Sequence, residues 1–252
     1  MRTDVKQIIL FSIAAAAIAG MFLTKPIPQD PAYHVFADQR AMLAIPNFWN
    51  VVTNIPFMII GTMGMVLVAF KGTAGGLPEL RTEYFGFFLG VCATGFGSAY
   101  YHYHPTNGAL LWDRFPIAIT IVAFFCTVVG ERISATTSRK LFWPLIALGI
   151  GSVLYWYTTE KSGSGDLRFY ALVQYLPVVL VPVILMLFKA RLIPAAYLWA
   201  VAGSYLVAKI AEVLDGPIYA AGLLLSGHSL KHLVAALGTY LFYTALRSRR
   251  IV

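Results

Sequence analysis

Long runs of apolar residues constrain this chain more than any other feature of its sequence. Of 252 residues, 59% are hydrophobic and only 12% are charged, whereas a typical soluble domain carries about 25% charged residues. A helix needs about 20 apolar residues to cross a bilayer. The sequence therefore predicts an all-α, polytopic integral membrane protein with no soluble domain of useful size. The candidate spans lie near residues 7–23, 50–70, 84–103, 110–130, 141–157, 169–188, 194–214 and 229–246.

Lysine and arginine residues flank these spans unevenly. If the N-terminus lies in the cytoplasm, most basic residues outside the spans fall on the cytoplasmic side, as in the loops at 132–140 and 189–191. Positive residues mark cytoplasmic loops, so we expect both termini to be cytoplasmic. This bias also accounts for the formal net charge of +8, and no nucleic-acid motif accompanies that charge. We therefore expect membrane lipids, and not nucleic acid, as partners.

The first span has a basic start and an apolar middle, as a signal peptide does. Its small residues at 14–19 lie inside the apolar run instead of after it. We therefore expect an uncleaved transmembrane helix at this position.

Three polar clusters interrupt the apolar runs, each at the edge of a span. They are residues 98–102, 111–114 and 228–232. A hydrocarbon environment penalises a charged group by roughly 2.5–3.5 kcal/mol, so such groups suggest function. The predicted topology brings all three clusters to the non-cytoplasmic leaflet, because the second cluster follows the first after a short turn at 105–108 and the third begins the last span.

The histidines of these clusters have the pattern of metal ligands. His228 and His232 are four residues apart, so on a helix they lie on one face. Together with His102 they provide three imidazoles, the ligand set of some catalytic zinc sites. Asp113 is the only carboxylate in the clusters, and it could orient a water and act as general base and then acid. Ser98, on the face of His102, either packs helices or donates to a developing oxyanion.

This set of residues favours metal-assisted hydrolysis of a lipid-like substrate. A non-enzymatic receptor or transporter with a structural metal is the alternative, because Lys209, Glu212 and Asp215 lie in one span; they could instead pair with each other. A closed structural zinc site normally takes a fourth protein ligand, often cysteine. The two cysteines, Cys92 and Cys126, lie in mid-span away from the histidines, which favours the enzyme.

The segment at 33–54 is amphipathic, external and rich in side-chain oxygen atoms. It is either a solvated loop leading into a polar helix start, or a cap over the site. Asp38 and Asn50 are its candidate functional residues. His104, which lies in the turn after His102, is either a loop residue or a group that supports the metal ligands.

Four motifs, in order along the chain, resemble the alkaline ceramidase family. They are residues 48–54 (FWNVVTN), residues 97–102 (GSAYYH), Asp113 followed by Pro116, and residues 228–232 (HSLKH). This family belongs to a superfamily of seven-helix membrane hydrolases that includes the adiponectin/progestin receptors. The resemblance covers about residues 33–246, and the motifs are specific in combination.

The resemblance implies a seven-helix core that holds Zn²⁺ through His102, His228 and His232. It implies that Asp113 works with the zinc-bound water and that Ser98 assists at the oxyanion. The implied reaction is hydrolysis of the amide of ceramide, a linear amide, to a sphingoid base and a fatty acid. The site would face the non-cytoplasmic side, in agreement with the charge bias.

The chain departs from the family pattern in two places. The span at 7–23 precedes the family core, so we expect residues 1–32 to form an additional N-terminal transmembrane helix and linker, and residues 33–252 to form the ceramidase-like seven-helix domain. The family also carries an acidic calcium site before the FWN motif. Here that stretch keeps only Asp38, and Asn47 stands where the family has glutamate, which argues against calcium dependence.

The short loops and small size are typical of a bacterial protein. We therefore expect the inner membrane, with the active site toward the periplasm. Many bacteria make no ceramide, so another N-acyl lipid is an alternative substrate.

Overall fold

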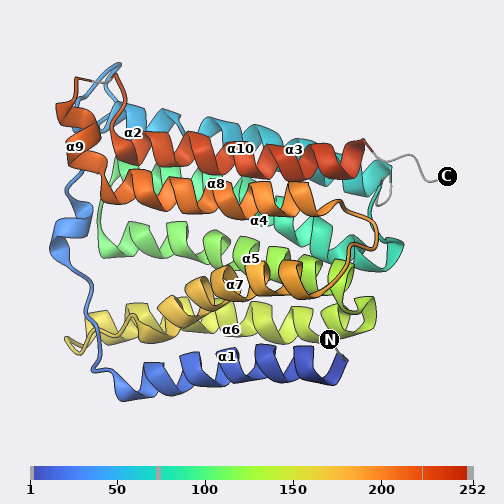
Figure 1. Cartoon of the computed structure of the whole chain (residues 1–252). Coiled ribbons are helices and arrows are strands. Elements are labelled where there is room, and N and C mark those ends of the chain that lie inside the picture. The colour runs from blue at the N-terminus through green and yellow to red at the C-terminus, as the bar shows by residue number, and fades with distance from the viewer. Residues whose placement is uncertain (1–2, 72–74, 223, 249–252) are drawn as a thin grey trace.

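The computed structural model describes residues 3–71, 75–222 and 224–248. Helix accounts for 79% of the chain and the described residues form no strand, which confirms the all-α prediction (Figure 1). The α-helices are α1 (Thr3–Leu23), α2 (Phe48–Val52), α3 (Ile55–Phe70), α4 (Arg81–Tyr103), α5 (Asn107–Arg132), α6 (Ala135–Lys161), α7 (Arg168–Leu187), α8 (Ala195–Val213), α9 (Asp215–Ala220) and α10 (Gly227–Arg247). Two short 3₁₀ helices are η1 (Pro31–His34) and η2 (Pro78–Leu80).

The long helices lie side by side in one bundle (Figure 1). Within the described residues, six helical segments are long and apolar enough to cross a membrane: α1, α2 with α3, α5, α6, α7 and α8. These segments indicate an integral membrane protein. Helices α4 and α10 have 23 and 21 residues and fall outside this set. A count of seven crossings plus one stays a prediction.

The expected span at 50–70 is divided into two helices. Helix α2 ends at Val52 and α3 begins at Ile55. The side chains of Thr53 and Asn54 donate to backbone carbonyls of α2, and Pro56 has no N–H to continue the α2 ladder. Pro56 therefore lies in the first turn of α3. Four other prolines lie inside helices: Pro116, Pro144, Pro177 and Pro182.

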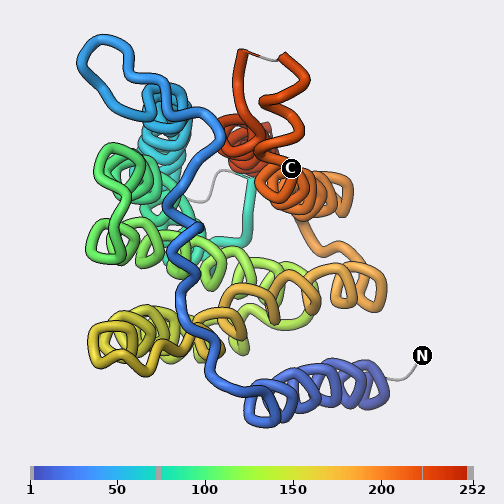
Figure 2. Tube along the Cα trace, turned by 90° about the vertical axis from the view of Figure 1, so that its left-hand side faces the viewer, coloured from blue at the N-terminus to red at the C-terminus, as the bar shows by residue number. Residues whose placement is uncertain are grey.

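Helix α1 lies at the periphery of the bundle. It has no buried residue, and it packs mainly against α7. Phe11 and Phe22 are each 73% exposed, as residues facing lipid would be. Figure 2 shows the chain leaving α1 and crossing the end of the bundle before it enters α2. The division into residues 1–32 and 33–252 stays a prediction.

Close helix packing determines where the polar residues lie. Helix α4 packs against α3 and α5, and α10 packs against α8 and α3. At Gly97 a Cβ atom would lie 2.1 Å from the Trp112 carbonyl oxygen, and at Gly227 one would lie 2.1 Å from the Ala211 carbonyl oxygen. Only glycine permits these approaches. They hold α4 against α5, and the start of α10 against α8.

The ends of the helices segregate the polar clusters. The C-terminal end of α4 and the N-terminal ends of α5 and α10 lie at the left of Figure 1, where residues 24–47 cross the bundle. Helix α1 begins, and helix α10 ends, at the opposite side of the bundle. The two described ends of the chain therefore share one side, away from the clusters. That this side is cytoplasmic stays a prediction.

Candidate metal centre and hydrolytic site

The structure brings together three histidines from two helices. His102 lies in the last turn of α4, and His228 and His232 lie in the first turns of α10. Their side chains are 1%, 5% and 4% exposed. One nitrogen from each ring lies within 4.8 Å of the others, and the two Nε2 atoms of His102 and His232 are 3.2 Å apart. Among the described residues this is the one such group of histidine, cysteine and acidic side chains.

One pair of these histidines has the spacing of two ligands of a tetrahedral metal ion. Two nitrogens bound to one zinc at about 2.0–2.1 Å would lie about 3.3 Å apart, close to the separation of His102 and His232. The Nδ1 atom of His102 and the Nε2 atom of His228 are buried with no hydrogen-bond partner. Buried polar atoms without partners are uncommon in native proteins. The three rings therefore have ring nitrogens available for an ion.

Thr53 orients one of the rings. The Nδ1 atom of His232 lies 3.0 Å from the Thr53 hydroxyl, and that hydroxyl donates to the Trp49 carbonyl at 2.6 Å. Because the hydroxyl proton is committed to Trp49, Nδ1–H of His232 must be the donor, which leaves its Nε2 lone pair for a metal. Sequence reasoning missed Thr53, although it lies in the FWNVVTN motif, because a threonine at a helix end has many ordinary roles.

Asp113 and Ser98 form a buried pair beside the histidines. Their exposed fractions are 7% and 4%, and the Ser98 hydroxyl is close enough to the Asp113 carboxylate to interact with it. The Oδ1 atom of Asp113 has no partner. The close α4–α5 approach at Gly97, next to Ser98, brings the two side chains together. One carboxylate oxygen is therefore available to a substrate or a water.

A cavity of about 900 Å³ connects this pair with the metal centre. Ser98, Asp113 and His232 all line it, and its walls come from α3, α4, α5, α7, α8 and α10. Most of its lining is apolar, including Phe57, Phe87 and residues of α7 and α8. Ligand sites of this size are commonly apolar with a few placed polar groups. The cavity can hold a long hydrocarbon chain with its polar end beside Asp113.

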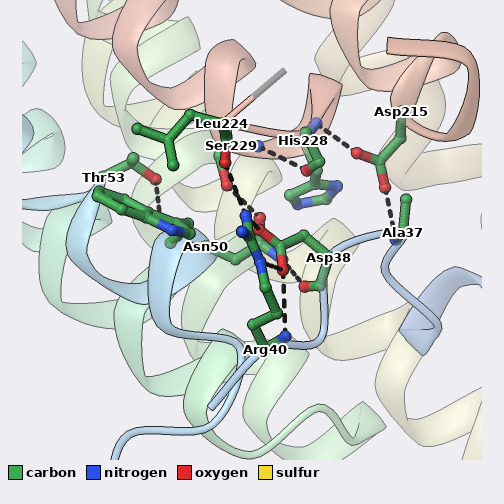
Figure 3. Close-up of polar contacts among 11 residues, drawn as sticks. Ala37, Asp38, Arg40, Asn50, Thr53, Asp215, Leu224, His228 and Ser229 are labelled. Carbon is green, nitrogen blue, oxygen red and sulfur yellow. Dashed lines mark hydrogen bonds and ion pairs between the residues drawn. The ribbon is translucent and has the colours of Figure 1, made fainter. Parts of the chain in front are cut away.

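The segment before α2 covers the histidines. The ring of Phe36, which is 3% exposed, lies 4.7 Å from the His102 ring and 4.9 Å from the His228 ring between centroids. Asp215 holds this segment in place, because its carboxylate accepts from the backbone N–H of Ala37 at 2.9 Å and of His228 at 2.7 Å (Figure 3). The segment is thus fixed to the start of α10.

Asp215 therefore does not join the pairing that the sequence suggested for Lys209, Glu212 and Asp215. Glu212 instead accepts from Lys209 and, at 2.6 Å, from Lys231. Lys231 lies between the two histidines of α10 in the sequence, and its ammonium group is already paired with the Glu212 carboxylate.

Asp38 lies in this covering segment, and Asn50 lies in α2 and binds the segment. The Asp38 carboxylate, 1% exposed, accepts from the Arg40 guanidinium at 2.8 and 2.7 Å, and this hydrogen bonding lowers the pKa of Asp38 below its usual range. Asn50 donates to the Asp38 carbonyl at 3.1 Å and accepts from the Ser229 hydroxyl at 2.7 Å (Figure 3). Asn47 donates to the His102 carbonyl at 2.9 Å. These polar side chains join the cap, α2 and the histidine-bearing helices.

His104 lies away from the metal centre. It is exposed and follows the last residue of α4, where its backbone N–H closes the helix on Tyr100. A different histidine, His34, supports the cap: its ring nitrogens lie 3.0 Å from the Tyr101 hydroxyl and 3.0 Å from the Asn107 side-chain oxygen.

Comparison with known proteins identifies the family of the chain. The model of the Ceramidase family matches residues 40–206, which include Ser98, His102 and Asp113 and end before the histidines of α10. No curated protein matches the chain significantly. The matched region covers more than half of the 252 residues. The chain therefore belongs to the Ceramidase family.

Proposed function

We propose that this protein is a zinc-dependent intramembrane hydrolase that cleaves the amide bond of ceramide or a related N-acyl lipid. The observation that carries the proposal is the convergence of three buried histidines on one point, with His232 in the wall of the same cavity as Ser98 and Asp113. Family membership supports an amide as the bond that is cut. We further propose the bacterial inner membrane as its location, with the site toward the periplasm.

His102, His228 and His232 would hold the ion as three neutral imidazoles. When bound, zinc with an open position supplies a Lewis acid and lowers the pKa of a bound water to about 7. The hydrogen bond from His232 to Thr53 fixes the ring tautomer that presents Nε2. The cap, with Phe36 against two of the rings, excludes bulk water from that side.

Asp113 would move the protons of the reaction. Its free Oδ1 atom would accept a proton from the attacking water and then deliver it to the leaving amine, the two roles of a general base and acid. Ser98 would donate to the oxygen of the scissile carbonyl as negative charge develops there. Because Ser98 and Asp113 line the same cavity, both groups would lie on the same side of the amide.

The remaining cavity would take the acyl chain. Its lining between α5, α7 and α8 is apolar, so a long chain can leave the bilayer without exposing hydrocarbon to water. Burial of each methylene contributes about 0.8 kcal/mol. This apolar volume favours lipid amides over soluble ones.

A receptor or transporter with a structural metal is the second candidate function. The observation that favours it is the group Lys209, Glu212 and Lys231 in the cavity wall. These side chains are paired with each other, however, and the metal-ligand group within the described residues has three protein ligands, as catalytic zinc sites do.

Metal analysis of purified protein tests the proposed site. The wild-type protein should contain about one zinc per chain, and His232→Ala should lose both the zinc and amide hydrolysis. His104→Ala is the matched control, because it removes an exposed histidine two residues from His102 and should keep both. Full zinc content and full activity in His232→Ala would refute the site.

A further inference from the structure

Arg114 is a buried cation that follows Asp113 on α5. It is 6% exposed and lines the same cavity as Asp113. Its Nη2 atom donates to the Gln29 side-chain oxygen at 2.6 Å. Its guanidinium carbon lies 4.0 Å from the Trp156 ring centroid and 4.9 Å from that of Tyr170. These aromatic rings and the amide hold the guanidinium in one orientation.

No carboxylate forms an ion pair with this guanidinium within the described residues, and Asp113 acts on it only at longer range, whereas several other cations of the chain are paired. Lys209 and Lys231 share Glu212, and Arg168 pairs with Asp166. The Nη1 atom of Arg114 is buried without any hydrogen-bond partner. A buried charge without an ionic partner is strongly unfavourable. The site therefore has one positive charge without an ion pair and one N–H donor that is available to a ligand.

We propose that Arg114 binds an anionic group, a phosphate or a carboxylate, on the polar head of the N-acyl lipid substrate. This inference rests on the proposed function and narrows its substrate class, because ceramide itself carries no charge. A guanidinium matches both anions through paired N–H donors. Since Arg114 adjoins Asp113 in the chain and both line one cavity, the anion would belong to the part of the lipid near the scissile amide.

The segment that crosses the bundle end completes this subsite. Gln29 and Tyr33 line the cavity beside Arg114, and the Tyr33 ring centroid is 5.8 Å from the guanidinium carbon. Asp30 also borders the cavity, but it is exposed and its carboxylate accepts from the Ala32 N–H at 2.8 Å. The exposed Asp30 therefore does not pair with the buried Arg114 guanidinium, which lies against the aromatic rings.

Binding without turnover tests the inference separately from the proposed hydrolysis. Protein in a neutral maltoside detergent is titrated with dodecyl phosphate, dodecanoate and dodecanol, and each Kd is measured. At least one anion should bind the wild type about tenfold more tightly than the alcohol, as one charge-assisted hydrogen bond allows. The phosphate and carboxylate arms identify which anion is preferred.

Three variants locate the preference. Arg114→Gln should bind all three probes alike, and Arg114→Lys, which keeps the charge but loses the planar donor pair, should keep part of the preference. Lys161→Gln is the control: it removes an exposed cation at the same end of the bundle and should keep the full preference.

Two results would overturn the inference. One is a wild type that binds anions no better than dodecanol. This result uses the wild-type protein alone and does not depend on whether a variant folds. The other is an Arg114→Gln protein that keeps the full anion preference, as it would if the anions bound only at the histidines. If the first result came together with hydrolysis of neutral ceramide, the inference would fall and the proposed function would stand.

Discussion

The Nδ1 atom of His232 lies 3.0 Å from the Thr53 hydroxyl oxygen, although 179 positions separate the two residues. Thr53 lies at the break between α2 and α3, and the same break lets its hydroxyl donate to the Trp49 carbonyl. The break between the two helices thus orients a histidine of the candidate metal centre. Partners of this kind fix the tautomer and the direction of a ligand.

Replacement of Thr53 should weaken metal binding while leaving the three histidines in place. Thr53→Val keeps the side-chain shape and removes the acceptor of the His232 N–H, so the zinc affinity should fall by about 10–100-fold. Thr53→Ser keeps the hydroxyl and should bind zinc nearly as the wild type does. Competition with a chromogenic chelator measures both values. Equal affinity in the valine and wild-type proteins would show that Thr53 does not support the ligand.

Gly97 should tolerate no side chain. In Gly97→Ala the new Cβ atom would meet the Trp112 carbonyl oxygen at 2.1 Å, so α4 and α5 must separate, at a cost of about 1–3 kcal/mol for overpacking. Gly151→Ala is the matched control, because nothing lies within 4 Å of its Cβ position in α6. Thermal unfolding in detergent should show a lower Tm for Gly97→Ala alone. A Tm equal to that of the control would contradict the close packing.

The cap should loosen in acid. Hydrogen bonds from Arg40 lower the pKa of Asp38 below its ordinary value of 3.8. A carboxyl whose folded pKa is depressed contributes stability that is complete above its unfolded pKa and is lost as the pH falls through its folded pKa. The pairing of Asp38 should therefore be constant near neutral pH and disappear below about pH 4.

Asp38→Asn makes this contribution measurable. The Tm difference between wild type and Asp38→Asn should be constant from pH 7 to pH 5 and shrink below pH 4. Arg40→Gln should give the same profile, because it removes the other half of the ion pair. A Tm difference that does not change with pH in either variant would exclude the pair as the cause.

Hydropathy was enough to predict most of the helices. The expected spans at 84–103 and 110–130 correspond to α4 (Arg81–Tyr103) and α5 (Asn107–Arg132), because a bilayer forces long apolar helices. Spacing brought His228 and His232 onto one face, and the charge bias placed His102 at the same end of the bundle. The break before Pro56 was missed, because hydropathy averaged over a long apolar run does not show where the backbone hydrogen bonds of a helix are interrupted.

Contacts between segments far apart in the chain could not be predicted from the sequence pattern. Phe36 was unremarked in the sequence, yet its ring covers His102 and His228. Asp215 looked like a partner of Lys209 and instead binds two backbone N–H groups. Both roles depend on how the chain crosses the bundle end, and helical periodicity carries no information about that path.

The most direct test of the account is the rate of amide hydrolysis by Asp113→Asn at unchanged zinc content. Release of the free amine from N-acyl sphingosine and from an anionic N-acyl lipid is measured for the wild type and the variant, with bound zinc determined in the same samples. Asparagine keeps the size of the side chain but cannot accept and return a proton. Both proteins should contain one zinc per chain, and the rate should be about 10²–10⁴-fold lower in Asp113→Asn. A variant that keeps its zinc and hydrolyses these amides at the wild-type rate would contradict it.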